Sequence, residues 1–296
     1  MATATPSHTL PRKRPLGTLA LGALAVGGVV IGFSLSSTLV KRAETPGVLV
    51  AFWRLTVATI VWNLYVRCTG RRVTIRDLRQ ALVPGAFFGL NLAIFFAGAT
   101  KNSVANAALI GSLAPFFIVP IGAKLFKEFN DSRALVFAIV AFAGVGIVLF
   151  SAPAKGDATL GGNMFGLIAM LLLVGYVVST RRFRHDMDVA IFMAAICPVG
   201  ALAVLPLAVV NGGVFGMSGT GWTYMLILTL ISGVVANGLL VYAQRAIQIG
   251  TISVAQVVQP AIAVLWSVLL LDETVSGWQI AGIATSVAGL AVFVAI

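Results

Sequence analysis

Charged residues are scarce in this sequence, and their scarcity excludes an ordinary soluble fold. Asp, Glu, Lys and Arg make up 10% of the 296 residues, whereas hydrophobic residues make up 59%. Soluble domains carry about 25% charged residues. The chain is therefore predicted to be an integral membrane protein. The net charge is +11, and the Lys and Arg residues that produce it fall between the apolar runs rather than on one face. No nucleic-acid partner is therefore expected.

Residues that carry chemistry are equally sparse. His8 and His185 fall in polar segments, and Cys68 and Cys197 are isolated, which leaves no metal-ligand spacing and no disulfide framework. Phosphate-binding glycine loops, an HExxH motif and a Ser/His/Asp set are also absent. These absences argue against an enzyme. No catalytic residue, metal or cofactor is expected.

Long apolar segments dominate what remains. A helix needs about 20 apolar residues to cross the hydrocarbon core of a bilayer. Ten such segments can be delimited: 16–40, 46–66, 82–99, 103–126, 134–150, 162–180, 189–210, 221–243, 251–271 and 277–296. None carries Asp or Glu near its middle, so the usual carboxylate proton relay of a pump is missing.

The distribution of Lys and Arg predicts the orientation of these spans. With residues 1–15 as a cytoplasmic tail, most basic loop residues fall in cytoplasmic segments, and only Lys41, Arg42, Lys101 and Lys155 fall outside. Cytoplasmic loops of membrane proteins carry such an excess. The pattern favours ten spans, with both termini in the cytoplasm.

One stretch of the sequence, 105–150, is matched by a second stretch with the same spacing of proline, acid and glycine. The matched pairs are Pro115 and Pro260, Glu128 and Glu273, and Gly144 and Gly289. Five spans per repeat is an odd number, so the second copy enters the membrane from the opposite side. We predict an all-α membrane protein in which ten helices form an inverted 5+5 repeat around a central cavity. The repeats are 16–150 and 161–296, joined by an external linker, 151–160. The competing interpretation is that any two pairs of membrane helices look alike.

Neutral polar side chains within the spans are the candidates for a binding site. They are Asn91, Asn106, Tyr176, Ser179, Asn237, Tyr242, Gln256 and Gln259. Exposing such groups to lipid is costly, so they should face one another or a wet cavity. Any single one is equally explained by hydrogen bonding between helices. Together they favour a cavity.

Aromatic rings are the second ingredient of that predicted site. The candidates are Phe95, Phe96, Phe116, Phe117 and Trp266, beside Tyr176. Rings interspersed with amides and hydroxyls suit a small organic molecule with polar ends, such as an amino acid. The predicted substrate-binding set is Asn91, Asn106, Tyr176, Tyr242, Gln256, Gln259 and Trp266.

Three further residues have special positions. Arg54 is the one charge within a span, and it either snorkels to the outer headgroups or contacts an anionic group of the substrate. Pro115 and Pro260 are expected to kink their helices and serve as gates, because proline removes a backbone donor. Gly28 with Gly32 and Gly85 with Gly89 have the spacing that permits close helix packing.

The sequence resembles the drug/metabolite transporter superfamily in its ten-span EamA-type branch. The resemblance is carried by the paired Pro115–Glu128 and Pro260–Glu273 segments, by Trp53 and Arg54, and by the layout from Leu16 to Ile296. Within the family, the chain is similar to bacterial aromatic amino-acid exporters of the inner membrane. The resemblance implies a basket of helices around a central cavity. Many members have glutamate where this chain has Gln259, which puts proton coupling in doubt.

The expected function is export or facilitated passage of amino acids, including aromatic ones, by alternating access. We expect a monomer in the lipid bilayer with a small-molecule substrate. The alternatives are export of other metabolites or hydrophobic drugs and, from another class, an intramembrane lipid-modifying enzyme. Competition against amino-acid efflux would distinguish the first alternative. Product formation without vectorial movement would favour the second.

Overall fold

The computed structural model describes most of the chain. The described residues are 16–99, 114–126, 160–184, 187–211, 214–256 and 258–271, with 139–140, 143, 147, 277–278, 280–282, 284–285 and 288. Within them all regular secondary structure is helical. A membrane chain satisfies its backbone hydrogen bonds within each helix, because the bilayer core offers no water.

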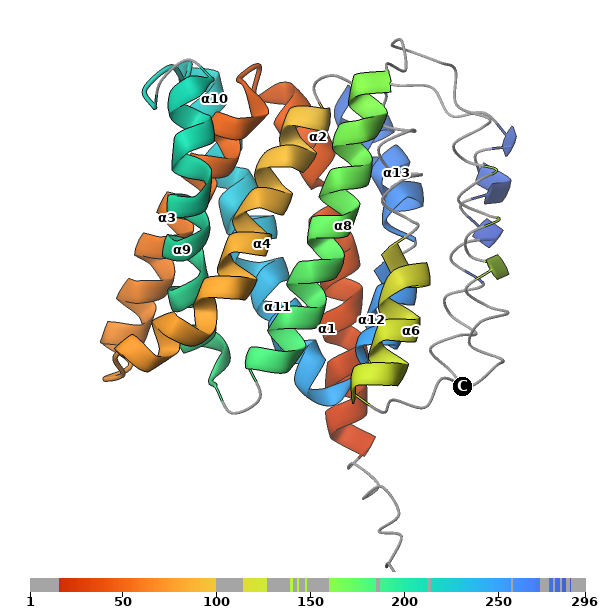
Figure 1. Ribbon diagram of the computed structural model, residues 1–296. Coiled ribbons are helices and arrows are strands. Elements are labelled where there is room, and N and C mark those ends of the chain that lie inside the picture. Colours follow the sequence, from red (N-terminus) through yellow and green to blue (C-terminus); the bar gives the residue numbers. More distant parts are fainter. Residues whose placement is uncertain are drawn as a thin grey trace, which may run out of the picture.

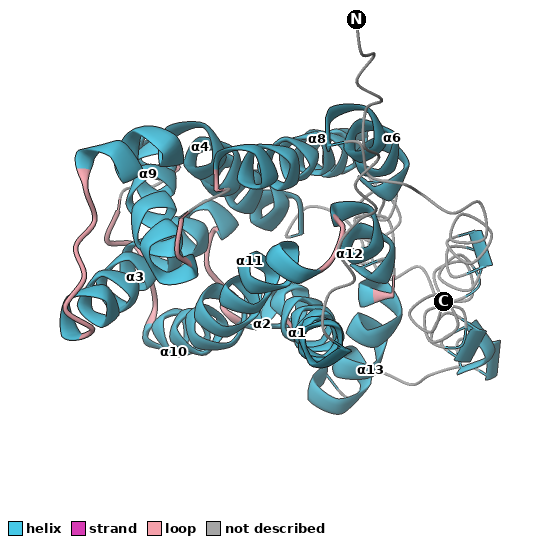
Figure 2. Cartoon of the chain, turned by 90° about the horizontal axis from the view of Figure 1, so that it is seen from below, coloured by secondary structure: helices cyan, strands magenta, loops and turns pink. Residues whose placement is uncertain are grey.

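The helices stand side by side as a bundle (Figure 1). Their bounds are α1 (Leu16–Ser34), α2 (Ser36–Arg42), α3 (Gly47–Cys68), α4 (Ile75–Ala99), α6 (Ala114–Phe126), α8 (Leu160–Phe183), α9 (Val189–Val210), α10 (Gly219–Leu228), η1 (Thr229–Ala236), α11 (Asn237–Ala246), α12 (Ile249–Gln256) and α13 (Gln259–Leu271). Viewed from below, α4 and α8 lie on one side of the bundle, and α1, α2 and α10 lie on the other (Figure 2).

Six described helical stretches are long and apolar enough to cross a membrane. They are Ala20–Arg42, Gly47–Cys68, Ile75–Ala99, Met164–Phe183, Val189–Val210 and Gly219–Gln244. These stretches coincide with the first three predicted spans and with the sixth to eighth. The predicted spans 134–150 and 277–296 lie outside the described residues, apart from a few positions. The count of ten and the inverted symmetry therefore stay predictions.

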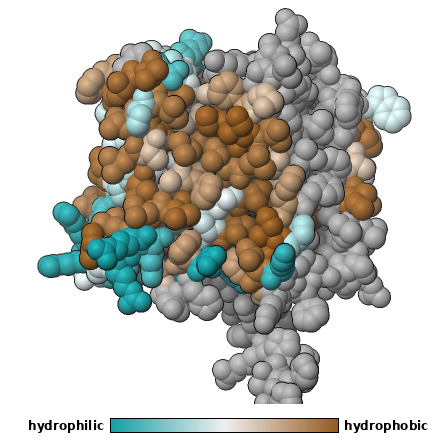
Figure 3. Space-filling model, viewed as in Figure 1, coloured by the Kyte–Doolittle hydropathy of each residue, from teal (hydrophilic) through white to brown (hydrophobic). Residues whose placement is uncertain are grey.

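The outer surface of the bundle is apolar over most of its height. Leu24 and Leu202 are 73% and 68% exposed, and Ile60 and Leu64 are also exposed. Figure 3 shows a broad hydrophobic face, with hydrophilic residues gathered where α3 ends and α4 begins. Large apolar side chains on the outside are stable only against lipid or another apolar surface. The surface is that of a multi-pass membrane protein.

Helix α4 begins earlier than the predicted span 82–99. Thr74 and Asp77 cap its start reciprocally: the Thr74 backbone N–H donates to Asp77 Oδ2 at 2.8 Å, and the Asp77 N–H donates to Thr74 Oγ1 at 3.3 Å. Such a capping box satisfies backbone donors that the first turn leaves free. The helix therefore starts at Ile75, before the apolar run begins.

Glycines bring α4 and α9 into close contact. A Cβ atom placed on Gly89 would overlap the backbone of Gly200, and one placed on Gly85 would lie 2.8 Å from Val199 Cβ. In α1, Gly28 and Gly32 lie against α11 and η1 in the same way. The predicted close packing at both glycine pairs is confirmed. Small residues let membrane helices approach closely enough for dispersion forces and polar contacts to hold them.

Polar contacts also join α3 to α9. The Asn63 amide donates to the carbonyl of Ala194 at 3.0 Å, and Arg71 forms an ion pair with Asp188 at 2.8 Å. Asp188 in turn accepts from the backbone N–H of Ala190, which caps α9. The α3–α9 seam is therefore fixed both within the bundle and at its polar end.

Two predicted spans are not continuous α-helices. Span 221–243 contains η1, a π-helical segment between α10 and α11. Span 251–271 is interrupted between Gln256 and Gln259, which leaves Pro260 in the first turn of α13. Proline is well tolerated there because a first-turn N–H needs no partner within the helix.

Candidate functional site

A central cavity of about 190 Å³ lies inside the bundle. Residues of α1, α2, α3, α4, α6, α8, η1, α11, α12 and α13 line it. Drug-sized ligands occupy pockets of roughly 300–1,000 Å³. The cavity is below that range and suits a small solute.

Four of the predicted substrate-binding residues line this cavity: Asn91, Tyr176, Gln256 and Gln259. Asn91 donates its amide to the Ala169 carbonyl of α8 at 2.7 Å. Gln259 Nε2 donates to Gln256 Oε1 at 3.2 Å across the break between α12 and α13. The sequence therefore identified polar residues from three separate parts of the bundle that converge on one space.

The remaining predicted residues have other positions. Tyr242 is 37% exposed on α11 and does not line the cavity. Trp266 is not in the lining either, but its indole N–H donates to Ser34 Oγ at 2.9 Å, and Ser34 does line the cavity. Asn106 lies outside the described residues. Pro115 belongs to α6, and its side chain is also outside the described part.

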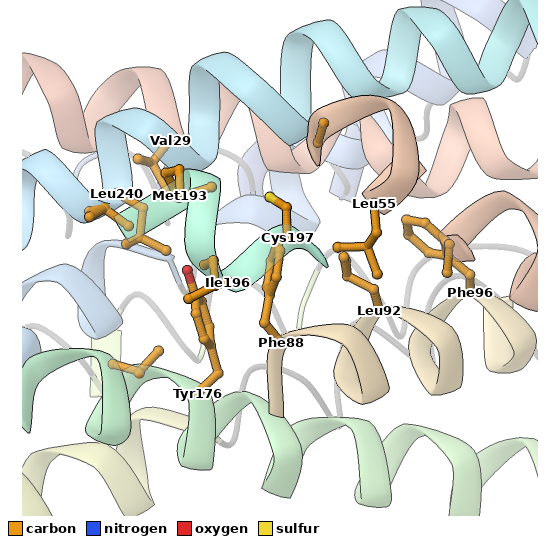
Figure 4. Packing of buried hydrophobic residues seen from close by; sticks show 14 of the residues in the cluster. Val29, Leu55, Phe88, Leu92, Phe96, Tyr176, Met193, Ile196, Cys197 and Leu240 are labelled. Carbon is orange, nitrogen blue, oxygen red and sulfur yellow. The ribbon is translucent and has the colours of Figure 1, made fainter. Parts of the chain in front are cut away.

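Aromatic rings form much of the apolar wall. Phe33, Phe88, Phe95 and Phe96 line the cavity. The rings of Phe88 and Tyr176 lie with centroids 4.9 Å apart, joining α4 to α8 (Figure 4). Aromatic pairs at this spacing stabilise each other beyond their buried area. The cavity thus has rigid walls on the side of α4 and α8.

Arg54 is buried beside this cavity, with 2% of its surface exposed. Its Nη2 donates to Ser232 Oγ at 3.0 Å, and its Cζ lies 5.5 Å from the centre of the Phe96 ring. Burial resolves one alternative left by the sequence, because a snorkelling arginine would extend its head group to the membrane surface. Arg54 lies within the bundle instead.

No carboxylate of the described chain neutralises Arg54. The described acids are Glu44, Asp77 and Asp188, each at a helix end or in a connection, and none lines the cavity. An unpaired charge in a low-dielectric interior is costly. Residues that carry such a cost are typically functional in membrane proteins.

Serines complete the polar lining, and sequence analysis missed them. Ser34, Ser36, Ser37 and Ser232 all line the cavity. The hydroxyls of Ser36 and Ser232 lie 2.8 Å apart. Serine is common in membrane helices because its hydroxyl bonds to nearby carbonyls of its own helix, so its presence alone marks no site. The only signal in the sequence was that Ser34, Ser36 and Ser37 lie close together, at about the same expected depth in the membrane as Arg54.

Comparison with known proteins gives a family and a fold. The sequence model of the EamA-like transporter family matches residues 12–150 and again 160–295. An uncharacterized transporter of Synechocystis sp. is 24% identical over 216 residues, covering 69% of this chain and 59% of its own length. The pseudopaline exporter CntI of Pseudomonas aeruginosa is 23% identical over 180 residues, covering 59% and 62%. The chain thus spans about three fifths of these curated relatives.

A solved crystal structure has a similar fold, with a TM-score of 0.74 at 19% sequence identity. The match covers 94% of this chain and 97% of the other. At this identity the likeness concerns the fold alone. It extends over most of both chains, so the bundle has a known precedent.

Proposed function

Because this chain belongs to the EamA-like transporter family, we propose that it exports amino acids, aromatic ones among them, from a bacterial cell. The observation that carries this proposal is the central cavity, where amides, serines and one arginine face aromatic rings. Polar groups at one side and rings at the other suit a small molecule with a charged head and an apolar body.

The proposed architecture is ten spans in an inverted 5+5 repeat. One observation supports it: the family model matches the chain twice in succession, over residues 12–150 and 160–295. Inverted repeats of this kind supply the two states of alternating access.

The proposed orientation places both termini in the cytoplasm of a cell whose inner membrane holds the protein as a monomer. The support is the charge pattern: Arg67, Arg71 and Arg72 are exposed at the end where α3 meets α4, opposite the α1–α2 end. Cytoplasmic ends of membrane proteins carry this excess of basic residues.

Transport is expected to be independent of a proton gradient, because no carboxylate of the described residues lines the cavity. The measurement is efflux of labelled phenylalanine from liposomes containing the purified protein. Efflux at the same initial rate with and without an imposed pH gradient is the expected result. A rate that collapses when the gradient is dissipated would contradict it.

Replacing Gln259 with alanine is expected to weaken phenylalanine binding about 5- to 10-fold, the effect of losing one neutral hydrogen bond. Gln259 lines the cavity and holds Gln256 through its amide, so the change affects both side chains. Titration of the purified variant with phenylalanine measures the effect. Gln248→Ala, at an exposed position between α11 and α12, is the matched control. Unchanged binding would remove Gln259 from the site.

Export of a different metabolite is the second candidate. It is favoured by one relative, which is named as a pseudopaline exporter. Unlabelled metabolites or hydrophobic drugs that reduce phenylalanine efflux would indicate a shared cavity. Folded protein that moves such compounds but no amino acid would place this candidate first.

A further inference from the structure

We propose that the cavity recognises the zwitterionic head group of an α-amino acid, with Arg54 binding the carboxylate and Asn237 accepting from the ammonium group. This inference rests on the proposed transport function and specifies which residues recognise the two charged groups of its substrate. It starts from the polar atoms of the lining that no described residue satisfies: Arg54 Nε, Asn237 Oδ1 and the Tyr176 hydroxyl are buried without a hydrogen-bond partner.

Arg54 and Asn237 each bond to the same residue, Ser232. The Ser232 hydroxyl accepts from Arg54 Nη2 at 3.0 Å, and the Ser232 carbonyl accepts from Asn237 Nδ2 at 2.7 Å. A carbonyl only accepts, so the asparagine must turn its NH₂ toward Ser232 and leave its own oxygen free. Tyr176, by contrast, belongs to α8 and packs against Phe88 of α4. A donor cation and a free acceptor therefore flank the same serine.

The π-helical segment explains this alignment. Ser232 lies in η1, and Asn237 is the first residue of α11. On an α-helix, residues five apart face directions about 140° apart. A π-helix bonds residues five apart, so they share one face. The Asn237 amide bonds to the carbonyl five residues earlier, and both residues line the cavity. Segments of this kind are frequent at functional sites.

The two groups differ in the charge that they favour. Arg54 supplies a permanent positive charge, and no described carboxylate of the lining opposes it. The Asn237 oxygen accepts from an N–H donor. A carboxylic acid without an amine would leave that oxygen unsatisfied. An amine without a carboxylate would face Arg54 with a like charge. A molecule with both groups on one end satisfies both residues.

The surrounding residues fix the head-group site and leave room for a side chain. The Phe96 ring lies against the Arg54 guanidinium and holds it in place by a cation–π contact. Gly233 packs so closely that a Cβ atom there would lie 3.2 Å from Arg54 Nε. Phe95, Met170 and Leu173 supply apolar lining. An apolar amino-acid side chain can pack against this lining.

Three ligands that share a phenyl ring separate the contributions. Phenylalanine carries both head-group charges, 3-phenylpropionate only the carboxylate, and 2-phenylethylamine only the ammonium. Their affinities are measured by titration of the purified full chain. The expected result is that phenylalanine binds about 10- to 100-fold more tightly than either analogue, since each loses a charge-assisted hydrogen bond.

Two substitutions test the assignment of each end. Arg54→Gln is expected to remove most of the preference for phenylalanine over 2-phenylethylamine, and Arg54→Lys to keep part of it. Asn237→Leu is expected to remove the preference over 3-phenylpropionate. Each readout is a ratio of affinities, so it does not depend on the folded fraction of a variant. Arg42→Gln and Asn211→Ala, both exposed and outside the cavity, are the matched controls.

The outcomes distinguish this inference from the transport function on which it rests. The inference is supported if the unmodified protein binds phenylalanine and each substitution removes the preference assigned to it. Variants that weaken all three ligands equally would overturn it, while amino-acid transport by the unmodified protein would still stand. Unmodified protein that binds neither phenylalanine nor other amino acids would overturn both.

Discussion

Replacing Ala263 with phenylalanine is expected to stop transport while leaving the protein folded. Ala263 is 6% exposed, belongs to α13 and lines the cavity. A benzyl group at this position takes up much of a space of about 190 Å³. Overpacking a filled core costs about 1–3 kcal/mol, but here the ring enters empty volume. Binding is therefore lost for steric reasons, and the packed helices are retained.

Two measurements establish this result. Phenylalanine efflux from liposomes is expected to fall at least about 100-fold, because a filled cavity excludes the whole ligand rather than one contact. The thermal unfolding midpoint of the purified variant is expected to stay within a few degrees of the original. Ala20→Phe, on the exposed side of α1, adds the same ring without filling the cavity. Full transport by Ala263→Phe would mean that substrate passes elsewhere.

Replacing Gly89 with valine, unlike the Ala263 substitution, is expected to prevent folding. The added Cβ would overlap the backbone of Gly200, including its carbonyl, and backbone atoms cannot move aside as a flexible side chain can. Helices α4 and α9 would have to separate along the seam. Overpacking and loss of core contacts together cost about 3 kcal/mol or more, a large part of a typical total stability of 5–15 kcal/mol.

Yield and homogeneity measure this prediction directly. The Gly89→Val protein is expected to be degraded or to aggregate on extraction, and any purified fraction should unfold at a markedly lower temperature. Gly27→Val is the matched control, since no atom lies within 4 Å of a Cβ placed there. A stable, monodisperse Gly89→Val protein would show that the α4–α9 seam can open without cost.

Most of the described spans were predictable because hydropathy and membrane thickness determine them. The prediction 189–210 agrees with α9 at both ends. The start of α4 was missed because the Thr74–Asp77 capping box extends the helix beyond its apolar run. The π-helical segment was missed because its residues are as apolar as those of an ordinary span. Local hydrogen-bond geometry leaves no trace in hydropathy.

The types of side chain in the candidate site were predictable, but only some of the individual residues that line it were. Asn91 and Gln259 were found because an amide within an apolar span is unusual. Tyr242 was grouped with Asn237, yet the two are five residues apart on α11, and α-helical geometry turns them to different faces. Ser179 bonds to the Gly175 carbonyl of its own helix at 2.6 Å, and it illustrates the alternative of local hydrogen bonding. Which side chains face the cavity depends on how each helix is rotated about its own axis, and the sequence does not determine that rotation.

The contacts of α9 have a mechanical consequence. Gly89 and Gly200 lock α9 to α4 backbone to backbone, while Asn63 and the Arg71–Asp188 pair lock it to α3. Packed backbones do not slide without losing these contacts. We therefore expect the three helices to move together as one unit. Any inward-to-outward rearrangement would then have to move the helices across the cavity, α1, η1 and α13, relative to this unit.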